Sequence, residues 1–289
     1  MQNTEELKES RLANAWAELQ LHAIEGNLLT ADAYRLAFAD PEFMLRRETR
    51  GLRMQLEMYK PELEQQALGI ESTIVVFGSA RFLAPEHAKL ALQAAQLDGD
   101  AQAVALAEQR LRNANYYDQA RLFARLVAGF GARRPAKERL YICTGGGPGI
   151  MEAANRGASE MGALTVGLNI ALPHEQGANP YVSPSLNFKF HYFALRKMHF
   201  MMRAKALVAF PGGMGTLDEL FEVLTLVQTR KAKPVPIILF GTAYWKRLVD
   251  FDMMVEEGTI SKEDLTLFTY TDDPHVAWDT IRTFYELGN

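Results

Sequence analysis

Residues 206–219 read ALVAFPGGMGTLDE, and this stretch indicates the fold most clearly. Its first five residues are apolar on both faces, as in a central strand of a parallel sheet. The next five form a glycine-rich turn, and apolar residues then recur at helical spacing at Leu217, Leu220, Phe221 and Leu224. The stretch therefore predicts a strand, a turn and a helix. Glycines let the backbone approach a ligand, and the first amides of the helix attract phosphate.

Two other strand ends have the same character. The sequence LYIC at residues 140–143 leads into TGGGPGIM at 144–151, and IVVF at 74–77 ends in GSAR at 78–81. In an open parallel sheet, ligands bind beyond the carboxyl ends of the strands, so turns from three separate strands can line one crevice. The sequence therefore predicts a phosphate-binding crevice at one edge of the sheet.

Strand signals alternate with helix signals from residue 74 onward, with strands expected near 74–77, 139–143, 164–168, 206–210, 235–239 and 266–270. This order predicts an α/β domain over residues 71–289, with a doubly wound, Rossmann-like parallel sheet. Residues 1–70 have helical spacing without strands, which predicts a helical extension. Residues 85–138 exceed an ordinary crossover and are interpreted as a helical insertion after the first strand. The loop 172–186 contains several prolines and is the expected movable cover of the crevice.

Composition and charge exclude several classes of protein. The chain has 289 residues, 48% of them hydrophobic, and a net charge of −4, which is typical of a soluble domain and does not favour a nucleic-acid partner. No apolar run reaches the roughly 20 residues that cross a bilayer, and the first ten residues are polar, so we expect a cytoplasmic protein without a membrane partner. The single cysteine, Cys143, is expected to be buried and inert. His174, His191 and His199 lack metal-ligand spacing, so no metal site is predicted.

Glu219 and Ser79 each have two interpretations. Glu219 follows Thr216 by three residues, which fits a capping box that satisfies amides at the start of a helix. Alternatively, the Glu219 carboxylate lies one turn above a phosphate-binding turn and reaches the sugar of a bound nucleotide; the two interpretations are compatible. Ser79 either donates its hydroxyl to a ligand or bonds to the backbone of its own turn.

Arg196 opens a segment with several positive charges. Most charges on such a helix face water, and we expect this of Lys197, Arg203 and Lys205. Arg196 differs in its position, because its helix leads into the strand that ends at the glycine-rich turn. Its guanidinium, near the helix start, is placed to lean over the same crevice.

Three motifs together resemble the LOG family, whose members are also labelled lysine decarboxylases. The motifs are Gly-Gly-Gly-Pro-Gly-Ile-Met at 145–151, the pair Arg196-Lys197, and Pro-Gly-Gly-Met-Gly-Thr-Leu-Asp-Glu at 211–219. The resemblance covers about residues 74–250. It implies a phosphoribohydrolase, a hydrolase that cleaves the N-glycosidic bond of nucleoside 5′-monophosphates, including cytokinin riboside monophosphates, to free base and ribose 5-phosphate.

The same resemblance implies roles for individual residues. Arg196 and Glu219 would form the catalytic pair, since their separation along the chain is similar to that in the family. Gly213, Gly215 and Thr216 would hold the phosphate. The other residues expected to bind the nucleotide are Ser79, Gly146, Gly147, Met151 and Gly212. No cofactor is predicted. Members of the family are dimers or larger oligomers with sites near subunit contacts, which implies a homodimer or larger homo-oligomer here.

The chain also departs from the plant-type pattern. Phe193-Ala194-Leu195 stands where those members have Met-His-Glu, and the first turn reads Phe-Gly-Ser-Ala-Arg where Cys-Gly-Ser is commoner. The expected substrates are therefore AMP-like nucleoside monophosphates, and the place of cytokinin nucleotides among them is left open. Two alternatives stand beside this hypothesis. One is a pyridoxal phosphate-dependent decarboxylase, for which no lysine is singled out. The other is a non-catalytic nucleotide sensor or carrier that uses the same turns.

Overall fold

The computed structural model describes residues 36–132, 134–171 and 177–288. The chain divides into two compact units, Met1–Leu56 and Glu57–Asn289. The division falls inside helix α3 (Arg50–Ala67), whereas the sequence places the end of the helical extension at residue 70. The first half of that predicted extension, residues 1–35, lies outside the described residues.

In the first unit, the described residues form short helical turns before α3. They are the 3₁₀ helix η2 (Ala37–Ala39) and α2 (Pro41–Leu45). Asp40 precedes α2, and its carboxylate accepts hydrogen bonds from the amides of Glu42 and Phe43. The N-cap therefore satisfies two of the amides that have no partner within the helix.

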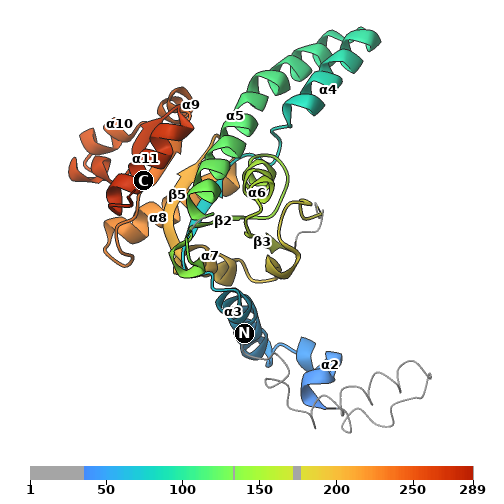
Figure 1. The fold of residues 1–289 in the computed structure, drawn as a ribbon, viewed down its shortest axis with the longest axis vertical. Coiled ribbons are helices and arrows are strands. Elements are labelled where there is room, and N and C mark those ends of the chain that lie inside the picture. Colours follow the sequence, from blue (N-terminus) through green and yellow to red (C-terminus); the bar gives the residue numbers. More distant parts are fainter. Residues whose placement is uncertain (1–35, 133, 172–176, 289) are drawn as a thin grey trace. The chain divides into compact units, whose positions relative to one another are not determined.

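The second unit is built on a seven-stranded sheet in which every pairing is parallel (Figure 1). The strands are β1 (Thr73–Phe77), β2 (Tyr141–Thr144), β3 (Thr165–Ile170), β4 (Asn187–Phe190), β5 (Ala204–Ala209), β6 (Ile237–Phe240) and β7 (Thr269–Thr271). Their order in the sheet is β4-β3-β2-β1-β5-β6-β7, so the direction of winding reverses between β1 and β5. The predicted doubly wound, Rossmann-like α/β fold is confirmed. Ligands of such sheets bind at this point of reversal, beyond the carboxyl ends of the strands.

Strand β4 is not predicted from the sequence. It has four residues at the edge of the sheet, and their exposure alternates with Phe188 and Phe190 buried and the other two exposed. Such an alternation over four residues is too short to separate from the irregular segment before it. Strand β7 is shorter than expected and begins later, because the 3₁₀ helix η5 (Glu263–Leu267) extends over the first two residues of the predicted range.

Helices of the second unit cover the sheet and connect its strands. In the described part they are α4 (Pro85–Asp98), α5 (Ala101–Gly131), α6 (Ile150–Glu160), α7 (Phe193–Met202), α8 (Met214–Gln228), α9 (Thr242–Leu248), α10 (Phe251–Glu256) and α11 (Pro274–Phe284), with 3₁₀ turns η3 (Ala136–Glu138) and η4 (Pro184–Leu186). None of the described helices has the length and apolar character needed to cross a membrane.

The segment interpreted as an insertion contains both a projecting hairpin and the crossover helix. Helices α4 and α5 lie side by side, joined at Gly99, which has a positive φ of 73° (Figure 1). Beyond this hairpin, α5 continues into the hydrophobic core, where Tyr117, Phe123 and Val127 are almost completely buried. The second half of α5 is therefore the ordinary connection from β1 to β2, and the first half is the added part.

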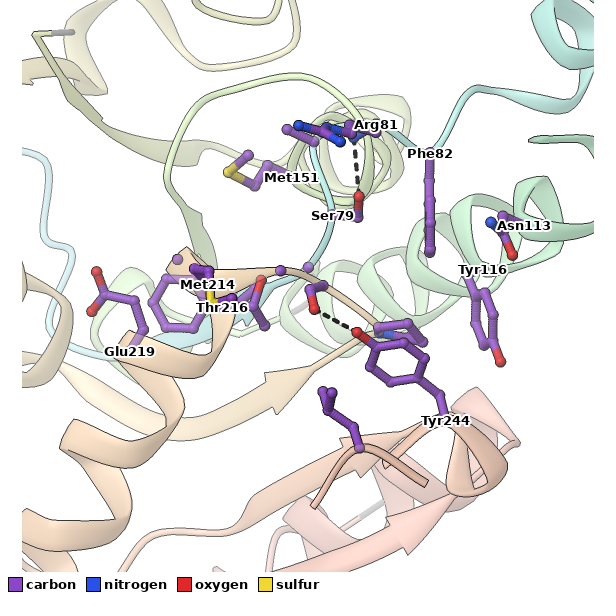
Figure 2. Close-up of a pocket in the computed structure, with 18 of the residues that line it drawn as sticks. Ser79, Arg81, Phe82, Asn113, Tyr116, Met151, Met214, Thr216, Glu219 and Tyr244 are labelled. Atoms are coloured by element: carbon purple, nitrogen blue, oxygen red, sulfur yellow. Dashed lines mark hydrogen bonds between the residues drawn. The ribbon is translucent and has the colours of Figure 1, made fainter. Parts of the chain in front are cut away.

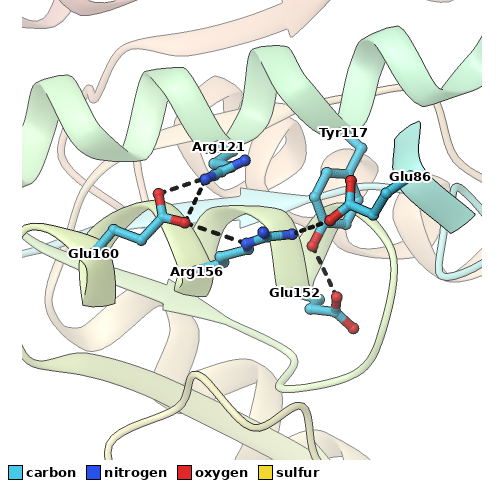
Figure 3. Close-up of polar contacts among 6 residues, drawn as sticks. All are labelled: Glu86, Tyr117, Arg121, Glu152, Arg156 and Glu160. Atoms are coloured by element: carbon cyan, nitrogen blue, oxygen red, sulfur yellow. Dashed lines mark hydrogen bonds and ion pairs between the residues drawn. The ribbon is translucent and has the colours of Figure 1, made fainter. Parts of the chain in front are cut away.

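Polar contacts attach α5 to α6 (Figure 3). The Tyr117 hydroxyl donates to the Glu152 carboxylate at 2.8 Å, and Arg121 donates through two nitrogens to Glu160. Arg156, also on α6, joins this network through its ion pair with Glu160 at 3.2 Å. Each exposed pair contributes little free energy alone, but together with the buried ring of Tyr117 they fix α5 on the helix that follows the first glycine-rich turn.

The strands supply the centre of the core. Every residue of β1, β2 and β6 is buried, including Cys143 on β2, which is 2% exposed. Burial raises the pKa of the Cys143 thiol to about 12. The thiol is therefore neutral at physiological pH, as expected of an inert core cysteine.

Candidate active-site crevice

Backbone hydrogen bonds join the three predicted turns at the carboxyl edge of the sheet. The Ser79 amide donates to the Pro211 carbonyl at 2.9 Å, and the Ile150 amide donates to the Ser79 carbonyl at 3.1 Å. Gly149 allows this approach: its φ is 71°, and a Cβ there would overlap the Ser79 carbonyl oxygen. A Cβ at Gly78 would lie only 2.6 Å from the Ile150 side chain. Glycine is thus required where the first and second turns meet.

A crevice of about 1130 Å³ opens where the turns meet (Figure 2). Most of the residues expected to bind or act on a nucleotide line it: Ser79, Met151, Arg196, Gly212, Gly213, Gly215, Thr216 and Glu219. These residues come from four separate elements, which the fold brings to one place. Their functional roles stay predictions.

Gly146 and Gly147 are not among the residues that line the crevice. Their carbonyls instead accept hydrogen bonds from the Asn179 side chain at 3.1 and 2.9 Å. Asn179 also donates to Asn155, which in turn accepts from the Thr144 hydroxyl at 2.7 Å. This buried network holds the first glycine-rich turn in one shape, because an unpaired polar group there would be costly.

Neither asparagine of this network was predicted from the sequence. Asn155 is fully buried on the inward face of α6, and a polar residue on an otherwise apolar helix face was the available signal. Asn179 lies in the loop expected to cover the crevice. Its bonds attach the described part of that loop, residues 177–186, to the glycine-rich turn. Residues 172–176 of the loop, with His174, lie outside the described residues.

The start of helix α8 carries no side-chain cap. Gly213 is its N-cap residue, and Thr216 and Glu219 stand at the third and sixth helical positions. The predicted capping box is therefore wrong, since its carboxylate would have to lie three positions after the cap. The amides of Met214 and Gly215 have no partner within the helix and lie at the crevice, at the positive end of the helix dipole. An anion can bind to them.

Arg196 and Glu219 meet at one end of the crevice. The Arg196 Nη1 atom lies 3.4 Å from Glu219 Oε1, and the two side chains are only 12% and 8% exposed. Arg196 is also held from the sheet, because its Nε donates to the carbonyl of Leu168 in β3 at 2.7 Å. Its guanidinium lies over the Phe200 ring, 5.0 Å from the ring centre. Residues of α7, α8 and β3 thus fix the positions of the two side chains.

Burial changes the ionisation of both partners. Removal from water raises the pKa of Glu219 to about 7, although the nearby cations Arg196 and Lys197 act in the opposite direction. Removal from water also lowers the pKa of Arg196. Glu219 therefore exchanges its proton near neutral pH, as suits a general base.

Two other cations of this region are paired with carboxylates. Lys197 contacts Asp218 at 2.8 Å and Glu222 at 3.0 Å, and Arg203 binds Glu62 at 2.6 Å. The expectation that Lys197 and Arg203 only face water is wrong, because carboxylates of α8 and of Glu62 lie within ion-pair distance of them. Lys205 is exposed, as expected, and lies over the ring of Tyr285.

Ser79 bonds within its own turn. Its hydroxyl oxygen accepts a hydrogen bond from the Arg81 amide at 3.1 Å (Figure 2). The hydroxyl hydrogen is still available to a ligand, since accepting one bond does not use the donor. The turn interpretation therefore describes this structure, and donation to a ligand stays a prediction.

Histidines contribute little to this site. His199 is 3% exposed, packs against Phe190, and has no hydrogen-bond partner for either ring nitrogen among the described residues. Burial lowers the pKa of His199. His191 packs against the ring of Tyr192. In the part of the chain that the structure describes, no group of three or more His, Cys, Asp and Glu residues is placed to hold a metal ion.

The wall of the crevice opposite Glu219 was not predicted. Gln109, Asn113 and Tyr116 of α5 line it together with Tyr244 and Arg247 of α9. Tyr244 is tied to the glycine-rich turn, because its hydroxyl donates to the Gly212 carbonyl at 2.6 Å. In the sequence, such scattered polar residues look like the solvated face of a helix, and only the packing of α5 and α9 shows that they meet the crevice.

Two solved structures with a similar fold are molybdenum cofactor proteins. One is a molybdenum cofactor binding protein from Rippkaea orientalis, 18% identical, with a TM-score of 0.44; the match covers 74% of this chain and 98% of that one. The other is a Moco carrier protein from Chlamydomonas reinhardtii, 19% identical, with a TM-score of 0.46; the match covers 75% and 98% of the two chains.

Sequence comparisons give a more specific result. A family model described as "Possible lysine decarboxylase" matches residues 151–281. A probable cytokinin riboside 5′-monophosphate phosphoribohydrolase of Oryza sativa subsp. japonica is 27% identical over 154 residues, which cover 52% of this chain and 66% of the relative. A second from the same plant is 33% identical over 120 residues, covering 40% and 48%. An Arabidopsis thaliana phosphoribohydrolase is 42% identical over 67 residues, covering 23% and 31%.

The matched segments span less than two thirds of the length of these relatives. The segment matched by the family model, residues 151–281, includes the turn and helix that carry Glu219. The chain thus contains a domain of the LOG family, the family described as possible lysine decarboxylases, and is a distant homologue of the cytokinin riboside 5′-monophosphate phosphoribohydrolases.

Proposed function

We propose that this protein hydrolyses the N-glycosidic bond of nucleoside 5′-monophosphates and releases the free base and ribose 5-phosphate. One observation carries the proposal: the buried Arg196–Glu219 pair lies in the same crevice as the uncapped start of α8. The names of the plant relatives support the reaction class. The expected homo-oligomer stays a prediction.

The phosphate would bind at the start of α8. The amides of Met214 and Gly215 point their dipoles toward it, and the hydroxyls of Thr216 and Ser79 lie in the same crevice. Binding energy from this remote group can orient the reacting end of the substrate, so the 5′-phosphate contributes to catalysis as well as to affinity.

Glu219 would act at the ribose. Departure of the base leaves positive charge on the sugar ring, and a carboxylate nearby stabilises that charge. In the proposed step Glu219 takes a proton from water, the water oxygen bonds to C1′, and the C1′–N bond breaks with its electron pair leaving on the base. The base then takes a proton from solvent. Arg196 orients the Glu219 carboxylate and keeps it ionised more often than burial alone would allow.

The crevice does not fit the decarboxylase chemistry in the family description. Pyridoxal phosphate is held as a Schiff base on a lysine. None of the described residues that line the crevice is a lysine, and the nearby Lys197 is engaged by Asp218 and Glu222. We therefore derive no step through that cofactor.

Incubation of the protein with AMP is expected to yield adenine and ribose 5-phosphate in equal amounts. Adenosine, which lacks the phosphate, should have a kcat/KM lower by about a hundredfold, because two hydrogen bonds to a charged group are lost. Chromatography of the bases, over a panel of purine and pyrimidine monophosphates, measures both results. If AMP binds tightly and no base appears, the protein is a nucleotide sensor or carrier instead.

The acid side of the pH profile is expected to follow Glu219. Since its pKa is about 7, kcat for AMP should fall about tenfold per pH unit below that value and level off above it. Arg196→Gln should move the midpoint to higher pH, because the Arg196 cation lowers the pKa of Glu219. Turnover at saturating AMP between pH 5 and 9 tests this. A midpoint that is the same in both proteins would argue against Glu219 as the titrating group.

A further inference from the structure

The crevice extends past the start of α8 to a second region, which we call the aromatic arm. It comprises Phe82, Asn113, Tyr116, Tyr244 and Arg247. Figure 2 shows the arrangement: Glu219 lies on one side of Thr216 and Met214, and the labelled residues of the arm lie on the other side. The start of α8 therefore separates the carboxylate from the arm.

The wall of the arm belongs to α5 and is rigid. Gln109, Asn113 and Tyr116 are four and three residues apart, so they share one helix face over a length of about 10 Å. The next residue, Tyr117, is 1% exposed and bonded to Glu152 of α6. The part of α5 that presents Tyr116 is thus fixed to the helix that follows the first glycine-rich turn.

The arm has the chemistry of a site for a planar group. The rings of Phe82 and Tyr116 are stacked, with their centres 5.8 Å apart and their planes 19° apart. Tyr244 adds a third ring, held by its bond to the Gly212 carbonyl. Asn113 adds an amide that can donate and accept hydrogen bonds at the edge of such a group. Aromatic walls with a few polar groups are typical of sites for planar ligands.

Two cations of the crevice have no carboxylate partner among the described residues. Arg81 and Arg247 are exposed crevice residues, and neither forms an ion pair with another described residue. Lys197 and Arg203, by contrast, are both paired. The crevice therefore offers positive charge for a second anionic group, beyond the phosphate at the start of α8.

We infer that the aromatic arm binds a planar group that is joined, through a second phosphate, to the 5′-phosphate of the substrate. This inference rests on the proposed function: with the ribose at Glu219 and its phosphate at α8, only atoms attached to that phosphate reach the arm. The volume of about 1130 Å³ exceeds the range of about 300–1,000 Å³ usual for small-ligand pockets. The preferred substrate class is a pyrophosphate-linked dinucleotide. Its hydrolysis breaks the same C1′–N bond, adds water across it, and leaves the pyrophosphate intact.

A series of three adenine nucleotides tests the inference on the unmodified protein. ADP differs from AMP by the second phosphate, and P1,P2-di(adenosine-5′) diphosphate adds a planar group to ADP. We expect kcat/KM for adenine release to rise at each step, by about tenfold at the second, the size of one stacking contact. The dinucleotide has two equivalent halves, which doubles its kcat/KM on statistical grounds. This factor is divided out before the comparison. Values that stay level or fall along the series would overturn the inference.

Variants of the arm residues test which residue accounts for the increase in kcat/KM at each step of the series. Arg247→Gln should lower the ADP-to-AMP ratio of kcat/KM, and Tyr116→Leu should lower the dinucleotide-to-ADP ratio about tenfold. A ratio within one variant is insensitive to partial loss of folded protein. Asn113→Ala provides a second test at another residue of the arm. Arg112→Gln, an exposed residue of α5 outside the crevice, is the matched control. Equal losses of kcat/KM on all three nucleotides would show that the arm acts on the base that they share, or only on the fold.

The inference and the proposed function can fail separately. If AMP is hydrolysed and the dinucleotide has no advantage, the function stands and the arm inference is overturned. If no nucleotide loses its base, the function fails, and calorimetric binding tests the arm alone. A Kd for the dinucleotide about tenfold below that for AMP would then support the inference, and equal values would overturn it.

Discussion

Glu219→Gln is expected to lower kcat for adenine release from AMP by about a thousandfold, within the range found when a general base is removed. Glutamine has the same shape, but it cannot take a proton from water and carries no charge to stabilise the sugar cation. Glu222→Gln, one turn further along α8, is the matched control: it makes the same chemical change to a carboxylate that does not line the crevice. Single-turnover measurements at pH 8 separate the chemical step from product release.

The same substitution should change how stability depends on pH. The pKa of Glu219 in the folded protein is raised from 4.5 to about 7, so this residue favours the folded state below pH 4.5. That contribution is lost as the pH rises through 7, and the loss amounts to about 3 kcal/mol at most. Glutamine does not titrate. The Gln variant should therefore gain stability relative to the unmodified protein between pH 5 and pH 8.

Urea unfolding at these two pH values measures this gain. The comparison across pH cancels the constant cost of leaving Arg196 without its carboxylate partner. Normal turnover in the Gln variant would remove Glu219 from the mechanism. An activity loss without any pH-dependent gain in stability would instead show that the carboxylate has an ordinary pKa in the folded protein.

Gly149→Ala is expected to reduce the free energy of unfolding by about 3 kcal/mol or more. The backbone there has φ 71° and ψ −129°, a conformation that is strained for alanine, and the added Cβ would overlap the Ser79 carbonyl oxygen. Relief requires the first two turns to separate, which breaks the bond from the Ile150 amide to Ser79. The crevice would be damaged along with the fold.

Gly162→Ala is the control for this substitution. Its φ of 70° is nearly the same, but a Cβ there would meet no atom within 4 Å. Its cost should be about 1 kcal/mol, from backbone strain alone. Denaturant unfolding of both variants gives the two values, and equal losses would show that the contact between the turns adds nothing.

Much of the fold could be predicted because its signals are local. Strands β1, β2 and β5 each contain a run of three or more apolar residues, and each is followed by a turn of small residues. The edge strand β4 was missed, because four alternating residues carry too little pattern. The pairing of β1 with β5 across the point of reversal follows from general rules of α/β topology, so the position of the crevice could also be predicted.

The candidate site could be predicted only in part, because contacts between distant residues decide its details. The capping box failed because α8 begins at Met214, and this start depends on how the turn meets Ser79 and Tyr244. Gly146 turns away from the crevice because Asn179, far along the chain, binds its carbonyl. The charges of α7 are paired because neighbouring helices carry carboxylates.

By itself, the sequence determined the order of strands and helices, the glycine-rich turns at the strand ends, and the presence of Arg196 and Glu219 near one of them. Periodicity and turn chemistry act over a few residues, so they can be read without knowledge of the rest of the chain. Tertiary structure alone decided that burial raises the pKa of Glu219 to about 7, and that α5 and α9 complete the crevice with aromatic and cationic side chains. Solvent exclusion and side-chain proximity depend on packing between segments far apart in the chain, and no local pattern encodes them.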